Sequence, residues 1–413
     1  MVASLALLYI LRMLGLFMVL PVLTLYGNHY AGSSISLLGW ALGVYGLSQA
    51  CLQIPLGMLS DKWGRKPVIL LGLAIFAGGS LVAAFATTIE GLIVGRILQG
   101  SGAIAGAVMA MVADLTTEEN RTRAMAFIGA SIGISFALAL AIGPAIASAG
   151  GIEAVFSTTA ILAVCGMGVL YFVVPNAPGQ LTSPDKGAVG GVSKRESLGR
   201  VLSNPQLLRL NWGIFSLHAI LMAMFVVVPG VLEVRLDIGR EHHWLVYSLI
   251  LFGSFLFMLP IMNRMERPGK TSVGESGNPQ RKPVKAVFLS AVSALAVSLM
   301  VFSASLSVGI AVMSLLALFT FFVGFNLLEA TLPSLVSKLA PPSSKGTALG
   351  IYSTSQFAGV FLGGVVGGFT SQSWGPVGVL ILCSCVAVAW LMVASGMNLS
   401  ATPQQKVSEA LSS

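Results

Sequence analysis

The sequence predicts an all-α membrane protein with twelve transmembrane helices in two parallel six-helix repeats, and three observations carry this prediction. First, the chain of 413 residues is 55% hydrophobic and only 9% charged, whereas a soluble domain carries roughly 25% charged residues. Second, apolar stretches of transmembrane length recur along the whole chain. Third, the two halves of the chain resemble each other. The mean hydropathy of +0.89 therefore describes a surface that faces lipid rather than water.

Each predicted helix is an apolar stretch long enough to cross a hydrocarbon core of about 30 Å, which takes roughly 20 helical residues. The first stretch lacks the basic start and the cleavage site of a signal peptide, so we expect it to be retained as a helix. All four cysteines fall inside these stretches and are interpreted as core-filling residues, with no disulfide or metal site. The predicted helices span 2–26, 35–59, 67–88, 90–113, 124–148, 152–174, 207–232, 243–263, 284–305, 307–336, 346–370 and 374–397.

The segment 175–206, rich in Gly, Pro and Ser, predicts a cytoplasmic linker between two six-helix bundles at 1–174 and 207–397, with a short cytoplasmic tail at 398–413. Three motifs recur in order in both halves, which is the architecture of a secondary transporter. The matching pairs are FMVLPVL (17–23) with FVVVPGVL (225–232), GRKPVILLGL (64–73) with QRKPVKAVFL (280–289), and RTRAMAF (121–127) with KGTALGI (345–351).

The basic residues indicate membrane topology rather than a nucleic-acid partner. Of the 23 Lys and Arg residues, 19 lie in the segments after the even-numbered predicted helices, in the linker or in the tail. The opposite side holds Arg235 and Arg240, while Arg12 and Arg96 lie inside predicted helices. Because positive residues collect on the cytoplasmic side of membrane proteins, we expect both termini in the cytoplasm.

The stretch GMLSDKWGRKP (57–67) concentrates charge between two apolar helices. Hydrated cations at a cytoplasmic turn explain Lys62, Arg65 and Lys66, and Gly64 permits a tight turn that a Cβ would oppose. A positive anchor alone explains neither Asp61 nor Gly57. We therefore expect this loop to have a role beyond that of a positively charged anchor.

This loop resembles the signature loop between the second and third helices of the major facilitator superfamily. Arg96-x-x-Gln99-Gly100 resembles the fourth-helix motif of that family, and Leu14-Gly15 followed by Pro21 resembles its first-helix motif. The resemblance covers essentially the whole chain. It implies the major facilitator fold and a place in the inner membrane of a bacterium.

The resemblance also implies that the charged loop is a conformational latch. Asp61 would face the N-terminus of the helix that follows Lys345, a contact worth about 0.3–2 kcal/mol, and Gly57 would let that helix approach. Arg65 would bridge to Asp114, with Gly64 and Lys66 completing the loop. Such a latch holds the outward-facing state, because it exists only while the two halves touch on the cytoplasmic side.

Ionisable side chains inside the predicted helices are few, namely Arg12, Arg96, His218 and Glu329. By the resemblance, their four helices line the central cavity. A charge facing lipid costs about 2.5–3.5 kcal/mol on insertion scales, so such residues usually serve function. Glu329 is the only carboxylate deep in any predicted helix. We predict that Glu329, with His218 as its partner, carries the coupling proton.

Further polar residues on the same helices are candidates for the cavity and the substrate site. Arg96 has two open interpretations, as a structural residue of its motif or as a ligand. Gln53, Asn211 and Asn326 are interpreted first as hydrogen-bond partners between helices. The full set of cavity candidates is Arg12, Arg96, Gln99, Tyr45, Gln49, Asn326, Tyr352 and Gln356.

Gly143-Pro144 resembles the antiporter motif of drug-exporting members of the family. The match is partial, because Gly133 lies ten residues before Gly143 rather than nine, and Ala147 and Ser148 replace the trailing glycines. The motif favours export.

Together these features predict a monomeric, proton-coupled secondary transporter that exports a small amphiphilic compound in exchange for protons. Uptake of a small organic anion by proton symport is an alternative, because Arg12 and Arg96 give the cavity two cations. A membrane receptor or scaffold that does not transport is another, but it requires neither the latch nor the embedded ionisable groups.

The sequence has no nucleotide-binding P-loop and no catalytic constellation, so we expect neither an enzyme nor a cofactor or metal. The expected partners are the substrate, protons and the lipid bilayer.

Overall fold

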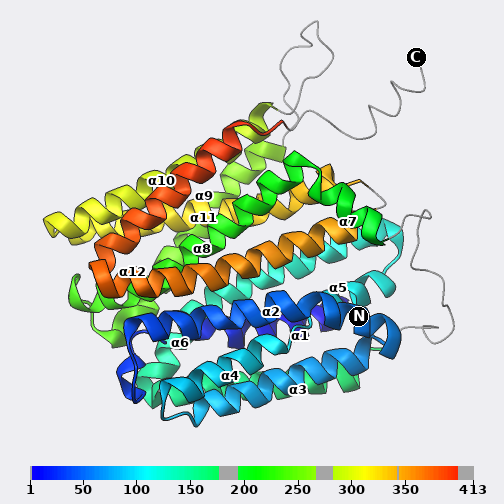
Figure 1. The fold of residues 1–413 in the computed structure, drawn as a ribbon, viewed down its shortest axis with the longest axis horizontal. Helices are drawn as coiled ribbons and strands as arrows, with labels where there is room; N and C mark the ends of the chain where they lie inside the picture. Colours follow the sequence, from blue (N-terminus) through cyan, green and yellow to red (C-terminus); the bar gives the residue numbers. More distant parts are fainter. Residues whose placement is uncertain (1, 176–193, 267–281, 342–343, 399–413) are drawn as a thin grey trace, which may run out of the picture. The chain divides into compact units, whose positions relative to one another are not determined.

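The structure of the chain is a computed structural model that describes residues 2–175, 194–266, 282–341 and 344–398 (Figure 1). Most of the predicted linker and nearly all of the predicted tail lie outside these residues. The described part of the chain is helical and contains no β-strand. The elements are α1 (Val2–Met18), η1 (Gly27–His29), α2 (Ile35–Trp63), α3 (Arg65–Ala84), α4 (Ile89–Ser101), α5 (Ala105–Asp114), α6 (Glu118–Gly168), η2 (Val169–Val173), α7 (Lys194–Leu202), α8 (Pro205–Val234), η3 (Arg240–His242), α9 (His243–Glu266), α10 (Lys282–Val308), α11 (Ala311–Leu339) and α12 (Lys345–Ser395).

Nine helical stretches among the described residues are long and apolar enough to cross a membrane, and α1 is a shorter apolar helix. Two of the nine stretches, Phe127–Val173 in α6 and η2 and Lys345–Ser395 in α12, have 47 and 51 residues, about twice the length that a bilayer needs. Each is bent, at Gly150 and Gly151 in α6 and at Gly375 in α12, where the backbone leaves the helical conformation. Each therefore supplies two of the predicted crossings, and the predicted twelve-helix fold class is confirmed.

The glycines at the two bends explain where the long helices turn. Gly151 has a φ of 72° and Gly375 a φ of 65°, a left-handed conformation that side chains with a Cβ rarely adopt. Pro376 follows directly in α12, and its fixed φ suits the start of a new helical segment. The bend of α6 falls between two predicted helices, and that of α12 falls at the start of the predicted helix 374–397.

Two predicted helices differ from the observed ones. The first was predicted over 2–26, but α1 ends at Met18 and the chain continues in turns through Pro21. A proline lacks the backbone N–H and crowds the carbonyl four residues earlier, which favours a helix end here, although α2, α8 and α11 each continue past an internal proline. The predicted helix 90–113 is likewise divided into α4 and α5, with Gly102 at the break.

The described contacts group the chain into two compact units. The first comprises Met1–Pro184, Leu221–Leu249 and Phe357–Val379, and the second comprises Asp185–Ile220, Ile250–Gln356 and Leu380–Ser413. Parts of α8 and α12 thus pack with the helices of the N-terminal half. The division into two sequence halves at 175–206 stays a prediction.

In the first unit, close backbone approaches hold α2 against the part of α12 that belongs to this unit. A Cβ on Gly43 would lie 2.5 Å from the carbonyl oxygen of Phe361, and one on Gly46 would lie 2.6 Å from that of Phe357. Gly143 of α6 is similarly close to the backbone of Met18, at 2.5 Å. Only glycine fits at such distances, so Gly143 of the antiporter-like motif is a packing contact between α6 and the end of α1.

Candidate transport site

A small polar cluster in the second unit contains the predicted coupling residues. His218 of α8 is 8% exposed, and its Nε2 lies 2.8 Å from Nε2 of Gln356 on α12 and 3.8 Å from Oε2 of Glu329 on α11. Gln356 Nε2 also makes a long contact of 3.5 Å to Glu329 Oε1. Three helices therefore bring together a carboxylate, an imidazole and an amide.

The hydrogen bonds of His218 assign its tautomer. Its Nδ1 lies 3.3 Å from the carbonyl oxygen of Ile214, one turn earlier in α8. A carbonyl only accepts, so Nδ1 carries the proton and donates. The lone pair on Nε2 then accepts from the amide of Gln356. In this arrangement His218 is neutral and Gln356 connects it to Glu329.

Glu329 is held loosely for a carboxylate inside a helix bundle. Its side chain is 35% exposed, yet Oε2 is buried and has no hydrogen-bond partner among the described residues. The hydroxyl of Tyr352, one turn before Gln356 on α12, also lacks a partner there. Asn326, one turn before Glu329, instead donates to Ser254 of α9 at 3.0 Å. Asn326 thus ties two helices, whereas Glu329 is left available.

The first unit buries two arginines on either side of Tyr45. Arg12 of α1 and Arg96 of α4 are each 1% exposed. The Tyr45 hydroxyl accepts from Arg12 NH2 at 3.3 Å, and the guanidinium of Arg96 lies 4.9 Å from the centre of the Tyr45 ring. No ion pair to a carboxylate forms at either arginine in the part of the chain that the structure describes.

Arg96 has its donors well matched by acceptors. Its Nε donates to the carbonyl of Ala41 at 3.1 Å and its NH1 donates to Gln99 Oε1 at 2.7 Å. Gln99 in turn donates to Ser80 of α3 at 2.8 Å. This chain of bonds ties α2, α3 and α4, which supports the structural interpretation of Arg96 over the ligand interpretation.

Arg12 is matched less well. Only its NH2 is bonded, to Tyr45, to Gln49 Oε1 at 3.1 Å and to the carbonyl of Gly102 at 3.1 Å. Its Nε and NH1 are buried without partners among the described residues, and so is Nε2 of Gln49. The Gly102 carbonyl is available because the helix is broken between α4 and α5. Residue type alone could not have predicted this contact.

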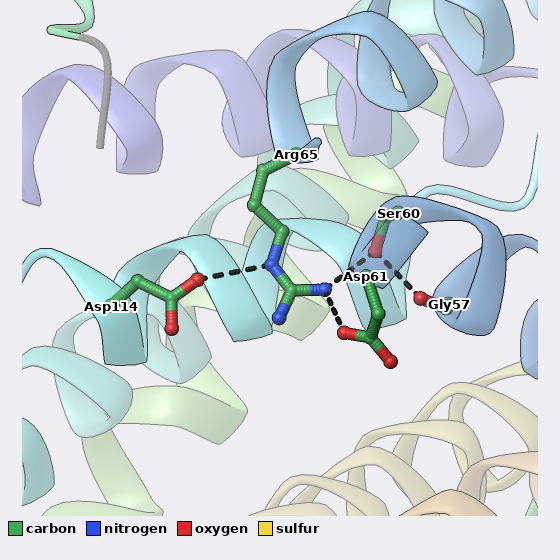
Figure 2. A network of polar contacts seen from close by, with 5 residues as sticks. All are labelled: Gly57, Ser60, Asp61, Arg65 and Asp114. Atoms are coloured by element: carbon green, nitrogen blue, oxygen red, sulfur yellow. Dashed lines mark hydrogen bonds and ion pairs between the residues drawn. The ribbon is translucent and has the colours of Figure 1, made fainter. Parts of the chain in front are cut away.

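The charged loop forms a compact network around Arg65 at the start of α3 (Figure 2). Its NH1 pairs with Asp61 Oδ1 at 2.6 Å and its Nε donates to Asp114 Oδ2 at 3.0 Å. Ser60, which sequence reasoning missed, accepts from Arg65 NH1 at 2.7 Å and donates to the carbonyl of Gly57 at 2.7 Å. The sequence does place this hydroxyl residue directly before Asp61, which could have suggested that it takes part in the network.

The remaining residues of the loop are placed as follows. Gly64 has a φ of 93° between α2 and α3, which explains the glycine. Lys66 is half-buried in the first turn of α3. No described atom lies within 4 Å of a Cβ placed on Gly57, so its surroundings in the first unit leave room for a side chain. Asp61 is 52% exposed. The latch stays a prediction.

Comparison with known proteins places the chain in a family. The family model described as Major Facilitator Superfamily matches residues 5–364. The Inner membrane transport protein YajR of Escherichia coli (strain K12) is 45% identical over 94% of this chain and 81% of that protein. The Tetracycline resistance protein, class H, of Pasteurella multocida is 38% identical over 138 residues, which are 33% of this chain and 34% of that protein.

A solved structure agrees on the fold. The crystal structure of a D-xylose-proton symporter superposes with a TM-score of 0.75 and covers 96% of each chain at 16% sequence identity. Among the described residues, no three His, Cys, Asp or Glu side chains gather closely enough to hold a metal ion. The chain therefore belongs to the Major Facilitator Superfamily, as a multi-pass membrane transporter rather than an enzyme.

Proposed function

We propose that this transporter couples proton entry to the export of a small amphiphilic compound by alternating access. The observation that carries the proposal is the carboxylate of Glu329, embedded in α11 beside His218 and Gln356. An ionisable group inside a membrane span usually marks an ion or proton pathway. Glu329 is the acid, and His218, whose Nε2 lies 3.8 Å from Glu329 Oε2, is its partner.

The physical argument concerns what happens to Glu329 during transport. The proton affinity of a buried carboxylate depends on the water and the charges around it. When the surroundings of Glu329 change between the two sides of the membrane, the group binds a proton on one side and releases it on the other. Its loose contacts in this structure favour such a role over that of a permanent ion-pair partner.

Two features favour export over uptake. One is Gly143-Pro144, which resembles the antiporter motif, and the other is the similarity of part of the chain to a protein named for tetracycline resistance. Proton-coupled uptake of a small organic anion is the second candidate, favoured by the unmatched donors of Arg12. The arrangement that we propose has both termini in the cytoplasm and works as a monomer.

The direction and the coupling can be tested together in everted membrane vesicles. We expect acidification of the vesicle interior to drive accumulation of an amphiphilic fluorescent dye from a panel with cationic and anionic members, and dissipation of the pH gradient with nigericin to release it. The control is vesicles that contain the Asp61→Asn variant, which we expect to fold but to transport more slowly. Accumulation that needs an alkaline interior would indicate uptake into the cell, and gradient-independent transport would contradict proton coupling.

A further inference from the structure

The unmatched donors around Arg12 have no role in the proton pathway proposed above. Arg12 is 1% exposed and Gln49 is 0% exposed. Three donor atoms of these two residues, Arg12 Nε, Arg12 NH1 and Gln49 Nε2, lack any acceptor among the described residues. A buried cation without a counter-charge is costly, and buried donors are nearly always paired. The site has an excess of both positive charge and hydrogen-bond donors.

A comparison with Arg96 shows that the unmatched donors of Arg12 are not a general property of buried arginines in this unit. It is equally buried and contacts the same tyrosine, but backbone and amide acceptors take up its Nε and NH1. The fold can therefore satisfy a buried arginine at this depth of the first unit. At Arg12 the bonds to Tyr45, Gln49 and Gly102 all converge on NH2. These bonds fix the guanidinium plane and leave its other nitrogens for a group that the protein does not supply.

We propose that Arg12 and Gln49 bind a carboxylate, so that the transported amphiphile is an organic anion. A carboxylate has two oxygens that accept several hydrogen bonds, and bonds between an ionised donor and an ionised acceptor are among the strongest in proteins. It supplies both the missing charge and the missing acceptors. The ring of Phe76, which is itself fully buried, lies 5.6 Å from the guanidinium carbon of Arg12.

This inference names the substrate class and in that respect rests on the proposed transport function. Binding is measured without transport, so the two can fail separately. Loss of carboxylate binding would leave the proton pathway through Glu329 intact, and loss of coupling would leave the binding site intact.

The test uses the purified full-length protein in nanodiscs of zwitterionic lipid. The probes are 4-phenylbutyrate, 4-phenylbutyramide and 4-phenylbutylamine, which share one skeleton and differ in charge, with acetate and benzoate as smaller carboxylates. Affinity is measured by calorimetry, and the thermal unfolding midpoint is measured with and without each probe. We expect the carboxylates to raise the midpoint and to bind at least about tenfold more tightly than the amide, the loss expected when a charged hydrogen bond is removed.

Variants assign the binding to the site. Arg12→Gln should bind 4-phenylbutyrate at least about tenfold more weakly, whereas Arg240→Gln, an arginine of the first unit that is already paired with Glu233 at 2.6 Å, should bind it as the parent does. Gln49→Glu places a carboxylate beside Arg12. It should raise the midpoint without any ligand and abolish the response to carboxylates.

The unfolding midpoint of Gln49→Glu without ligand keeps the proposal testable if Arg12→Gln folds poorly. This variant retains every group that holds Arg12. The proposal is overturned if the parent does not distinguish the carboxylates from the amide and the amine, or if Gln49→Glu lowers the midpoint and still binds 4-phenylbutyrate.

Discussion

The two units of this transporter bury their ionisable groups in opposite ways. In the first unit, Arg12 and Arg96 are almost fully enclosed, and short hydrogen bonds to backbone carbonyls and amides fix their positions. In the second unit, Glu329 is 35% exposed and its contacts to Gln356 and His218 are 3.5 Å and 3.8 Å long. Hydrogen-bond donors are in excess around Arg12, and an acceptor is in excess at Glu329.

This difference separates side chains whose charge is permanent from a side chain whose protonation can change. A group that must gain and lose a proton cannot be held by many short bonds to one of its charge states, because each such bond favours that state. An arginine stays charged throughout, so it can be fixed firmly without losing function. We infer that the first unit holds permanent charge and the second holds the charge that titrates.

The largest expected effect concerns Arg96, whose replacement tests whether the first unit depends on its fixed charge. Arg96→Gln leaves the acceptors on Ala41 and Gln99 without their donor, and each orphaned buried group costs about 1–3 kcal/mol. We expect the thermal unfolding midpoint in detergent to fall clearly. Arg12→Gln should lower it less, because Arg12 already has unmatched donors. An equal loss in both variants would remove the distinction between the two arginines.

A second, smaller effect is expected where α2 meets α12 in the first unit, two residues before Tyr45. Gly43→Leu would push a side chain into the backbone at Phe361, and overpacking of this kind costs about 1–3 kcal/mol. The matched control is Gly78→Leu on α3, since no described atom lies within 4 Å of a Cβ at Gly78. Unfolding midpoints measure both. A tolerated Gly43→Leu would mean that the close approach does not hold Tyr45 in place.

The smallest effect concerns the charged loop, where fixed charge is predicted to bias conformation rather than stability. Asp61→Asn should remove a contact worth about 0.3–2 kcal/mol and lower the outward-facing fraction, measured as distances between spin labels on the two sequence halves. Gly57→Leu should do the same without lowering the unfolding midpoint, because Gly57 has open space in this structure.

The matched control for the loop is Lys62→Gln, which removes an exposed cation of the same turn. An unchanged distance distribution in both Asp61→Asn and Gly57→Leu would exclude the latch. A lower unfolding midpoint for Gly57→Leu would instead indicate that the residue is packed in the resting state.

Much of the fold follows from the sequence because the bilayer dictates the length of each apolar helix. α10 ends directly before Gly309, α6 bends at Gly150 and Gly151, and α12 bends at Gly375-Pro376, all close to the ends of the apolar stretches. Pro21 also indicated the early end of α1, but the prediction of a helix over 2–26 followed the apolar pattern instead. The grouping of parts of α8 and α12 with the N-terminal helices had none, because it depends on contacts far apart in the chain.

The candidate site was predictable by residue type but not by partner. The rarity of charge in the membrane singles out Arg12, Arg96, His218 and Glu329. No sequence pattern shows that the Gly102 carbonyl accepts from Arg12, since a backbone oxygen has no residue type. Likewise, the sequence does not show that the guanidinium donors of Arg96 find acceptors while two nitrogens of Arg12 do not, because this depends on three-dimensional geometry. The pair Arg65 and Asp114, which are 49 positions apart, came from the family resemblance.

The most direct test of the account measures coupling in Glu329→Gln, which mimics the protonated acid and cannot titrate. The protein is reconstituted into liposomes, and a labelled substrate is followed under two conditions, exchange between equal pools and accumulation against a pH gradient. Glu233→Gln is the control, because Glu233 is a carboxylate of α8 paired with Arg240. We predict that Glu329→Gln retains exchange and loses gradient-driven accumulation, while Glu233→Gln retains both. Accumulation by Glu329→Gln at the level of the parent would contradict the assignment of the titrating charge to the second unit.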